Sequence, residues 1–445
     1  MKNNLLAILA VSIAFSATPL SAQTGDGASP VSHYGLSSMP PLRLGLAEAE
    51  SRALAHQPRL QAQILRAKAE QSTVTESRAA YLPQLTGNLT AVQANEDSVI
   101  AAGTLQTSSL STHAAWGVSL SQLVTDFGRS THLLHSARLS AQASNLNAEA
   151  VRLEIMRDVD EAYYALAAAE SVRNTAQAVL DYRKVSLRQL TSLAESQLKS
   201  TLDVQFAQVL VSEAEKAMVS ANSNVDSARA QLIEAMGDEI DTGYVLAEIP
   251  LPPRPDDELA VYLEHAQRNR PDLNAIRLEV RAAQQFSKAE NRISYPTITV
   301  LGNAGEVPTH DSTLRNQYGA IGVNVSIPLF RGGADRARSD EARFKAQAAL
   351  QDTAALGIRI ARDVRVAWAR SRDSYLQIDV AQTLVDQTSV AMRLAQARYE
   401  AGLGSVVELD QADLNRTSAL ISAASARFDY LRSCAELDYA VGIAR

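Results

Sequence analysis

Residues 206–235 read FAQVLVSEAEKAMVSANSNVDSARAQLIEA, and their apolar positions recur every three or four residues. A mean spacing of about 3.6 residues is that of an α-helix packed nearly straight against its neighbours. The surrounding sequence extends this pattern, because neither Gly nor Pro occurs between Arg129 and Met236. A second run, from Ala334 to Ala401, contains only Gly357. Both runs therefore predict helices far longer than those of ordinary globular domains.

Each run is interrupted at one place. The breaks fall at residues 196–200 and at Gly402-Leu403-Gly404, so each run predicts a helical hairpin. A first arm of about 68 residues would be about 100 Å long at 1.5 Å per residue. Taken alone, these helices would also fit a soluble coiled coil.

The chain is a tandem duplication. The sequence HQPRL at 56–60 recurs as NRPDL at 269–273, and further matches keep a constant offset of 205 residues up to Gly237 on Gly442. Repeats of this kind indicate one architecture built twice.

Each copy predicts helices, then two strands, then the helical hairpin. The strands alternate apolar with small polar residues, as a membrane β-barrel wall does, although an isolated hairpin of this kind would also suit a soluble protein. Aromatic residues lie near the strand ends, which favours the membrane. The predicted segments are a signal peptide (1–22), a flexible leader (23–41), a first repeat (42–237, strands about 84–95 and 114–124, polar loop 95–112, helical hairpin 129–237), an extended connector (238–257) and a second repeat (258–442, strands about 297–305 and 317–329, helical hairpin 334–442).

The N-terminus predicts export. Lys2 precedes the apolar run Leu5 to Phe15, and small residues lead to a cleavage site after Ala22, as in a secretory signal peptide. No later stretch is long and apolar enough for a transmembrane helix, so entry into a membrane would require a β-barrel. The formal charge of −7 gives no reason to expect nucleic-acid binding.

The sequence lacks the patterns of the common catalytic and metal sites. One Cys excludes a disulfide framework or a cysteine cage for a metal. The pair His132 and His135 is read as part of a solvated face, and no P-loop or dinucleotide motif is present. We therefore expect no enzyme activity, no cofactor and no resident metal.

Export, duplication, strand pairs and long helical hairpins together resemble the TolC-like outer-membrane efflux family. Three motifs carry the resemblance: NRPDL at 269–273, IPLFRGG at 327–333 and YEAGLGS at 399–405, followed by Glu408-Leu409-Asp410. The resemblance covers nearly all of residues 42–442.

The resemblance implies a mainly α protein with a membrane β-barrel part. It implies a homotrimer in which each chain gives four strands to a twelve-stranded barrel in the outer membrane, with a helical tunnel in the periplasm. Such a channel is the passive exit duct of a tripartite efflux pump or type I secretion system, and it passes drugs, metals or polypeptides. Its partners are a periplasmic adaptor, an inner-membrane pump and outer-membrane lipid.

The resemblance also implies a constriction at the tips. Three-fold symmetry would turn Glu408 into an acidic ring with Asp410 nearby, and such rings favour cations. Tyr399 is expected to face Asp203 across the tips, where a hydroxyl–carboxylate hydrogen bond would act as a latch. The two carboxylates after the second break could equally be ordinary residues near a helix start. The predicted tip turns contain Gly402, Gly404, Ser200 and Ser405.

A periplasmic coiled-coil scaffold or adaptor without a pore is the alternative. Adaptors usually have one helical hairpin per chain, whereas this sequence predicts two, each preceded by a strand pair. That difference favours the duct.

Overall fold

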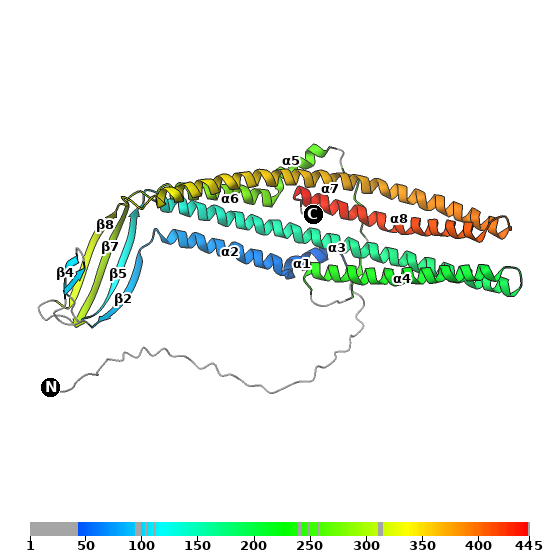
Figure 1. Ribbon diagram of the computed structural model, residues 1–445, viewed down its shortest axis with the longest axis horizontal. Coiled ribbons are helices and arrows are strands. Elements are labelled where there is room, and N and C mark those ends of the chain that lie inside the picture. Colours follow the sequence, from blue (N-terminus) through cyan, green and yellow to red (C-terminus); the bar gives the residue numbers. More distant parts are fainter. Residues whose placement is uncertain are drawn as a thin grey trace, which may run out of the picture.

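The computed structural model describes residues 43–93, 99–102, 105–109, 113–238, 243–247, 249–255, 258–309 and 315–443. The signal peptide (1–22) and leader (23–41) predicted from the sequence lie outside these residues. The molecule is elongated, with a β-sheet at one end and the tips of two helical hairpins at the other (Figure 1).

Two very long helices run the length of the molecule from the sheet to the tips. They are α3 (Arg129–Glu195) and α7 (Ala334–Glu400), each of 67 residues. At 1.5 Å per residue each is about 100 Å long. From the tips the chain returns through α4 (Thr201–Met236) and α8 (Val406–Val441), which end near the middle of the molecule (Figure 1).

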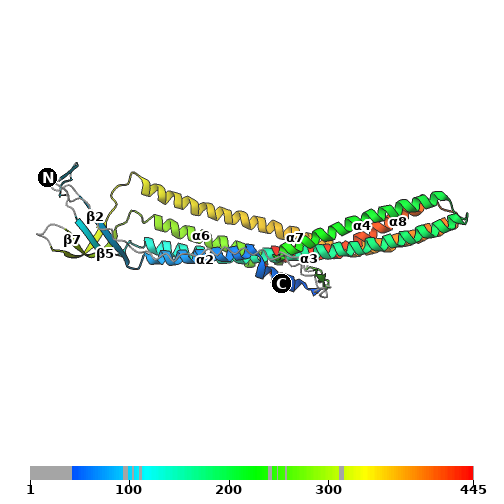
Figure 2. The same ribbon diagram turned by 90° about the horizontal axis from the view of Figure 1, so that it is seen from below.

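Shorter helices pack along the part of each long helix that lies nearer the sheet. In the first half these are α1 (Leu46–His56) and α2 (Pro58–Ala79), and in the second α5 (Leu259–Asn269) and α6 (Pro271–Glu290). Helices α2 and α4 lie along successive parts of α3, and α6 and α8 do the same along α7 (Figures 1 and 2). Each hairpin is therefore two helices thick over most of its length.

A proline separates the two short helices in each half of the chain. Pro58 and Pro271 occupy the first positions of α2 and α6, where their missing N–H costs nothing. The residues before them, Gln57 and Arg270, are extended with ψ of 114° and 116°. Proline disfavours the helical conformation in the preceding residue, so each half has two separate helices here in place of one.

The strands form one four-stranded antiparallel sheet in the order β2-β5-β7-β8. The strands are β2 (Gln84–Val92), β5 (His113–Thr125), β7 (Thr297–Thr309) and β8 (Gln317–Ser326). The register pairs Leu89 with Trp116, Leu120 with Gly302, and Gly302 with Ile321, which places the apolar positions on one face.

The loop predicted at 95–112 needs a correction. Part of it forms an antiparallel pair, β3 (Val99–Ala102) with β4 (Leu105–Ser109). Its polar composition indicated a loop, but Val99 and Ile100 have high β propensity and pair with Ser109 and Ser108. The connector likewise contains β6 (Val245–Leu246), which pairs in parallel with β1 (Arg43–Leu44).

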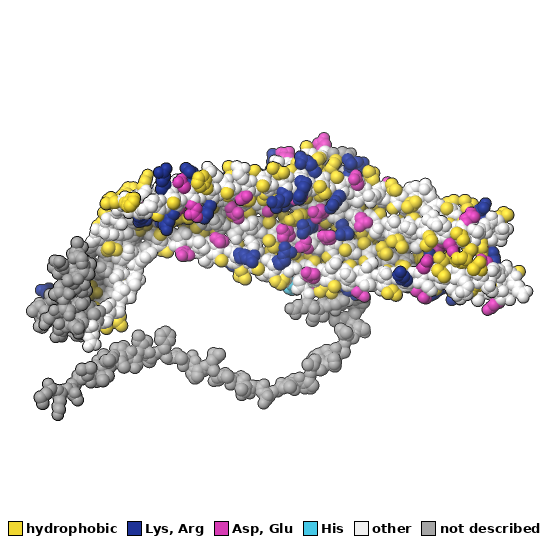
Figure 3. Space-filling model, in the orientation of Figure 1, with side chains coloured by type: hydrophobic (Ala, Val, Ile, Leu, Met, Phe, Trp, Pro, Cys, Tyr) yellow, Lys and Arg dark blue, Asp and Glu magenta, His cyan; other side chains and the backbone are white. Residues whose placement is uncertain are grey.

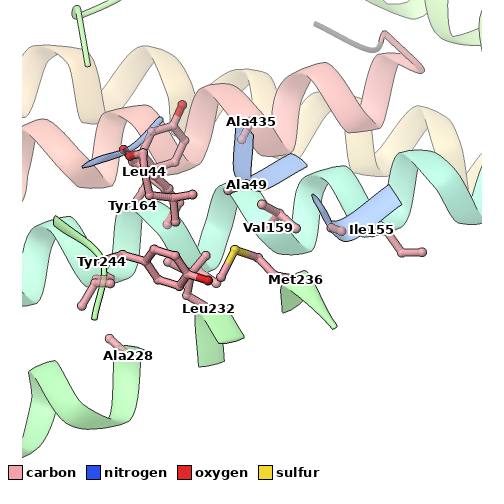
Figure 4. Close-up of a cluster of buried hydrophobic side chains, with 14 of the residues drawn as sticks. Leu44, Ala49, Ile155, Val159, Tyr164, Ala228, Leu232, Met236, Tyr244 and Ala435 are labelled. Atoms are coloured by element: carbon pink, nitrogen blue, oxygen red, sulfur yellow. Dashed lines mark hydrogen bonds between the residues drawn. The ribbon is translucent and has the colours of Figure 1, made fainter. Parts of the chain in front are cut away.

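The largest buried core lies halfway along the molecule, where α1, α3, α4, α8 and the β1–β6 pair meet (Figure 4). Tyr163 is fully buried there. Its hydroxyl lies 2.9 Å from the Leu44 carbonyl and accepts a hydrogen bond from the Ala247 amide at 3.1 Å. One side chain of α3 thus contacts β1 and the residue that directly follows β6.

The ends of α4 and α8 are capped in the same way. Gly237 and Gly442 adopt left-handed φ of 73° and 81°, and a Cβ on either would lie 3.0 Å from the backbone of the opposing residue. For α4 the opposing residue is Gln57, whose side-chain amide donates to the backbone carbonyls of residues 234 and 235. It is Arg270 for α8, where its guanidinium donates to the Ala440 carbonyl at 3.3 Å.

The charged side chains gather over the middle of the helical body, where acidic and basic groups alternate (Figure 3). Within the described ranges, none of the helices combines the length and the apolar character needed to cross a membrane.

Candidate functional site

The candidate site lies where the tips of the two hairpins meet. Both long helices end in the same turn, in which the amide three residues past the last helical residue reaches back to a carbonyl five residues earlier. Leu198 donates to Leu193 and Leu403 donates to Arg398, both at 2.8 Å. This Schellman turn needs a left-handed residue, which is Gly402 (φ 74°) in the second tip. In the first tip it is Gln197 (φ 58°), a conformation that costs energy for a residue with a Cβ.

The returning helices α4 and α8 begin with serine caps at Ser200 and Ser405. Ser200 Oγ accepts from the Leu202 amide at 3.2 Å, and Asp203 accepts from the Ser200 amide at 3.4 Å, which completes a capping box. Ser405 Oγ accepts from the Glu408 amide at 3.2 Å. The Asp203 carboxylate therefore serves the start of its own helix.

Glu408, predicted to contribute to an acidic ring, has a basic partner within its own tip. Its Oε1 lies 3.2 Å from Nε of Arg398, and both side chains are about half exposed. Arg398 also donates to the Leu403 carbonyl at 3.2 Å. Gly404 packs beside this pair, because a Cβ there would lie 3.3 Å from both side chains.

Tyr399 and Asp203, the predicted latch, line the same cavity between the hairpins. Tyr399 is only 9% exposed, and the ammonium of Lys199 lies 3.8 Å from its ring centroid. Burial, and then the neighbouring Asp203, raise the pKa of the Tyr399 hydroxyl. The geometry nevertheless falls short of a hydrogen bond, and the hydroxyl has no partner among the described residues. The two residues are brought together without the predicted bond between them.

The hairpins share a buried salt bridge that the sequence did not indicate. Arg183 of α3 and Asp413 of α8 are buried, with side chains 6% and 7% exposed, and form a salt bridge with Nη2 and Oδ2 2.8 Å apart. Arg183 Nε also donates to Asp413 Oδ2 at 3.0 Å, and Nη1 donates to the Leu210 carbonyl at 2.8 Å. One guanidinium thus connects α3, α4 and α8.

Asp410 lies on the cavity wall next to this bridge and is partly buried. Burial is the main cause that raises the pKa of its carboxyl; Asp413 and Glu213 raise it further, and Arg183 opposes them. The sequence predicted Asp410 near an acidic ring, and the structure places it between the two hairpins of one chain.

No signal in a single sequence marks Arg183 and Asp413. They are 230 residues apart and lie among many other charged residues of helical faces. A search for charged residues at core positions of the helical pattern could have selected them as candidates. Among the described residues, no group of three or more His, Cys, Asp or Glu side chains is arranged to hold a metal ion.

A duplicated sheet and helical-hairpin architecture of this length defines a class of elongated membrane channels, and comparison with known proteins agrees. Residues 50–238 and 262–443 match the family model described as outer membrane efflux protein. Protein CyaE of Bordetella pertussis is 28% identical over 385 residues, which cover 84% of this chain and 79% of that protein. Outer membrane protein TolC of Vibrio cholerae is 24% identical, with 89% and 90% covered. The solved outer-membrane channel OprN superposes with a TM-score of 0.79 at 17% identity over 90% of both chains.

The chain therefore belongs to the outer membrane efflux protein family. The predicted family, mainly helical fold with strand hairpins, outer-membrane location and role as an efflux or secretion channel are confirmed. The family is one of transport channels.

Proposed function

We propose that three copies of this chain form the outer-membrane exit duct of a tripartite efflux pump or type I secretion system. The observation that carries the proposal is the incomplete sheet. Among the described strands, β2 and β8 each pair on one side only, and all ten residues of β8 are exposed in the single chain. Unpaired strand edges are costly in lipid. Three sheets side by side, with β8 of one chain against β2 of the next, would form a closed wall.

The duct carries out no chemistry on its cargo and binds no cofactor. A periplasmic adaptor and an inner-membrane pump supply the cargo and the energy, and the pump selects among drugs, metals and polypeptides. The relatives support this assignment: they include a multidrug resistance outer membrane protein and a solvent efflux pump outer membrane protein.

The two repeats, 42–237 and 258–442, act as equivalent walls of the duct, and the signal peptide (1–22) directs export. The matched caps at Gly237 and Gly442 support this division, since Gln57 and Arg270 occupy the same place in each half.

The tips close the duct at its periplasmic end. In a trimer, Glu408 recurs three times and gives an acidic ring, modulated by its contact with Arg398. Within each chain, the buried bridge between Arg183 and Asp413 holds the hairpins together. Tyr399 and Asp203 line the cavity beside it, and a hydrogen bond formed between them would be a secondary latch.

The test is outer-membrane fractionation followed by planar-bilayer recording of the detergent-purified protein. We expect a heat-sensitive trimer and small cation-selective steps, with selectivity reduced in Glu408→Gln. Glu341→Gln, which changes an exposed carboxylate of α7 far from the tips, is the matched control. A soluble monomer without channel steps would contradict the duct and favour the periplasmic scaffold.

A further inference from the structure

We propose that the cavity between the two hairpin tips of one chain is a binding site for a small organic cation with an aromatic or apolar body. The site lies within a single chain, because α3 and α4 of one hairpin and α7 and α8 of the other supply its walls. An occupant would touch both hairpins at once.

The cavity has the size and the walls for such a body. Its volume is about 140 Å³. One water molecule needs only about 10–15 Å³ of cavity volume, and an apolar cavity of about 150 Å³ in another protein admits benzene. Apolar and aromatic side chains form much of the lining, among them Tyr182, Leu190, Phe206, Leu210 and Met392. These side chains suit a flat apolar body, and a tyrosine ring is also a partner for a cation.

The charges around the cavity favour a positive ligand. Four carboxylates line it, from Asp203, Glu400, Asp410 and Asp413, against the basic side chains of Arg183 and Lys199.

Both basic groups already have partners in the cavity wall. The guanidinium of Arg183 is bonded to Asp413 and to a backbone carbonyl, and Lys199 lies over the Tyr399 ring. Asp410 is the carboxylate best placed to receive a cation. It is partly buried, and no salt bridge of 4.0 Å or less connects it to another described residue. A cation would relieve the unfavourable burial of its charge.

An unsatisfied polar group provides an independent observation. Tyr399 lines the cavity and is nine-tenths buried, and its hydroxyl has no hydrogen-bond partner among the described residues. Buried hydroxyls are nearly always hydrogen-bonded, so the Tyr399 oxygen has unused capacity to accept a donor from an occupant of the cavity. An ammonium that reached Asp410 would lie on the same wall and could donate to this oxygen.

In the channel, a bound ligand would connect the two hairpins of one chain. A ligand that binds only when both hairpins line the cavity stabilises, by mass action, the arrangement in which the two hairpin tips of one chain lie together. Occupancy would therefore hold the tips of one chain together.

The experiment is a ¹⁹F NMR titration of the full chain, as the detergent-purified protein, with 4-fluorobenzylamine. The neutral 4-fluorobenzyl alcohol and the anionic 4-fluorobenzoate have the same ring and are the matched ligand controls. We expect saturable broadening and a shift for the amine, with at least tenfold weaker binding for the alcohol and none for the benzoate. Equal binding of amine and alcohol, or no saturable binding of the amine, would overturn the proposal.

Variants locate the site. Asp410→Asn should weaken amine binding at least tenfold, since it removes the charged acceptor while keeping the shape. Tyr399→Phe should weaken binding about threefold to tenfold, the effect of one neutral hydrogen bond. Glu215→Gln removes a carboxylate of α4 that pairs with Lys184 outside the cavity, and should leave binding within twofold.

If Glu215→Gln weakens binding as much as Asp410→Asn, the amine is attracted by general surface charge and the cavity site is wrong. Circular dichroism at 222 nm establishes folding, and Tyr399→Phe provides the test if Asp410→Asn does not fold. Binding is measured without a membrane, so a protein that binds the amine but gives no channel steps would contradict the duct and leave the cavity site intact.

Discussion

Replacing Arg183 by methionine should destabilise the tip region strongly. The side chain makes two hydrogen bonds, one from Nε to Asp413 Oδ2 at 3.0 Å and one from Nη1 to the Leu210 carbonyl at 2.8 Å, and its Nη2 forms the salt bridge with Asp413 Oδ2 at 2.8 Å. Methionine fills a similar length without any of them. The carboxylate of Asp413 would remain 7% exposed with no counter-charge.

The magnitude follows from that burial. Breaking a buried ion pair by removing one partner costs about 3–5 kcal/mol, because an uncompensated charge stays in a medium that solvates it poorly. Replacing both residues with apolar side chains, Arg183→Met with Asp413→Leu, should cost far less than the sum of the two single changes and can even stabilise by about 1–4 kcal/mol.

The assay is urea unfolding of the detergent-solubilised protein, followed by circular dichroism at 222 nm, for both single variants and the double variant. The control is Lys345→Met, since Lys345 pairs with Glu341 at 2.7 Å but both side chains are more than half exposed. Exposed pairs of this kind contribute less than about 1 kcal/mol. A loss below about 1 kcal/mol in Arg183→Met, or additive losses in the double variant, would refute the buried bridge as the main contact between the hairpins.

Three further changes test other parts of the structure. Gln197→Gly should raise the free energy of unfolding by about 1 kcal/mol in the same urea assay, because Gln197 adopts a left-handed φ of 58°. Gly402→Ala should lower it by about 1–2 kcal/mol, because Gly402 also has a left-handed φ. A loss of stability in Gln197→Gly would contradict the strained turn. Asp410→Asn should raise the melting temperature at pH 7, because burial and neighbouring carboxylates raise the pKa of Asp410, so its ionisation opposes folding. This gain in melting temperature should shrink as the pH falls towards about 3.9, the ordinary pKa of an aspartate. An unchanged melting temperature at pH 7 would count against this reasoning. Tyr163→Phe should cost about 1–3 kcal/mol by urea unfolding, because the Ala247 amide loses its acceptor, and a cost near zero would mean that water replaces the hydroxyl.

The long helices were predictable because one physical signal dominates them. A run without Gly or Pro and with 3.6-residue spacing leaves little alternative to a helix, and the turn at Gly402 interrupts it. The weaker elements were less predictable. In β3, Val99 and Ile100 favour a strand, but the polar residues around them indicate a loop, and pairing with β4 decides between the two.

The contacts between hairpins could not be read from the sequence, because they depend on which faces of which helices meet. Asp203 shows the difficulty. Its place at the first tip was predicted, but a carboxylate three residues after Ser200 also completes the cap of its own helix. Local capping and the hydrogen bond to Tyr399 compete for the same group, and in the structure the cap is formed.

The duplication makes the buried bridge asymmetric, and this decides where the tips should separate. At the offset of 205 residues, Arg183 corresponds to Thr388 of α7 and Asp413 to Gln208 of α4. The contact between α3 and α8 within one chain is therefore stabilised by a buried salt bridge. Its counterpart by the duplication would lie between α7 of one chain and α4 of a neighbouring chain in the proposed trimer, and it has no charged pair at these positions. Opening should then begin between chains rather than within one. Installing the missing pair, Thr388→Arg with Gln208→Asp, should lower channel conductance in planar bilayers, and each single change should do so less. Conductance that is unchanged in the double variant would show that the tips do not open along this interface.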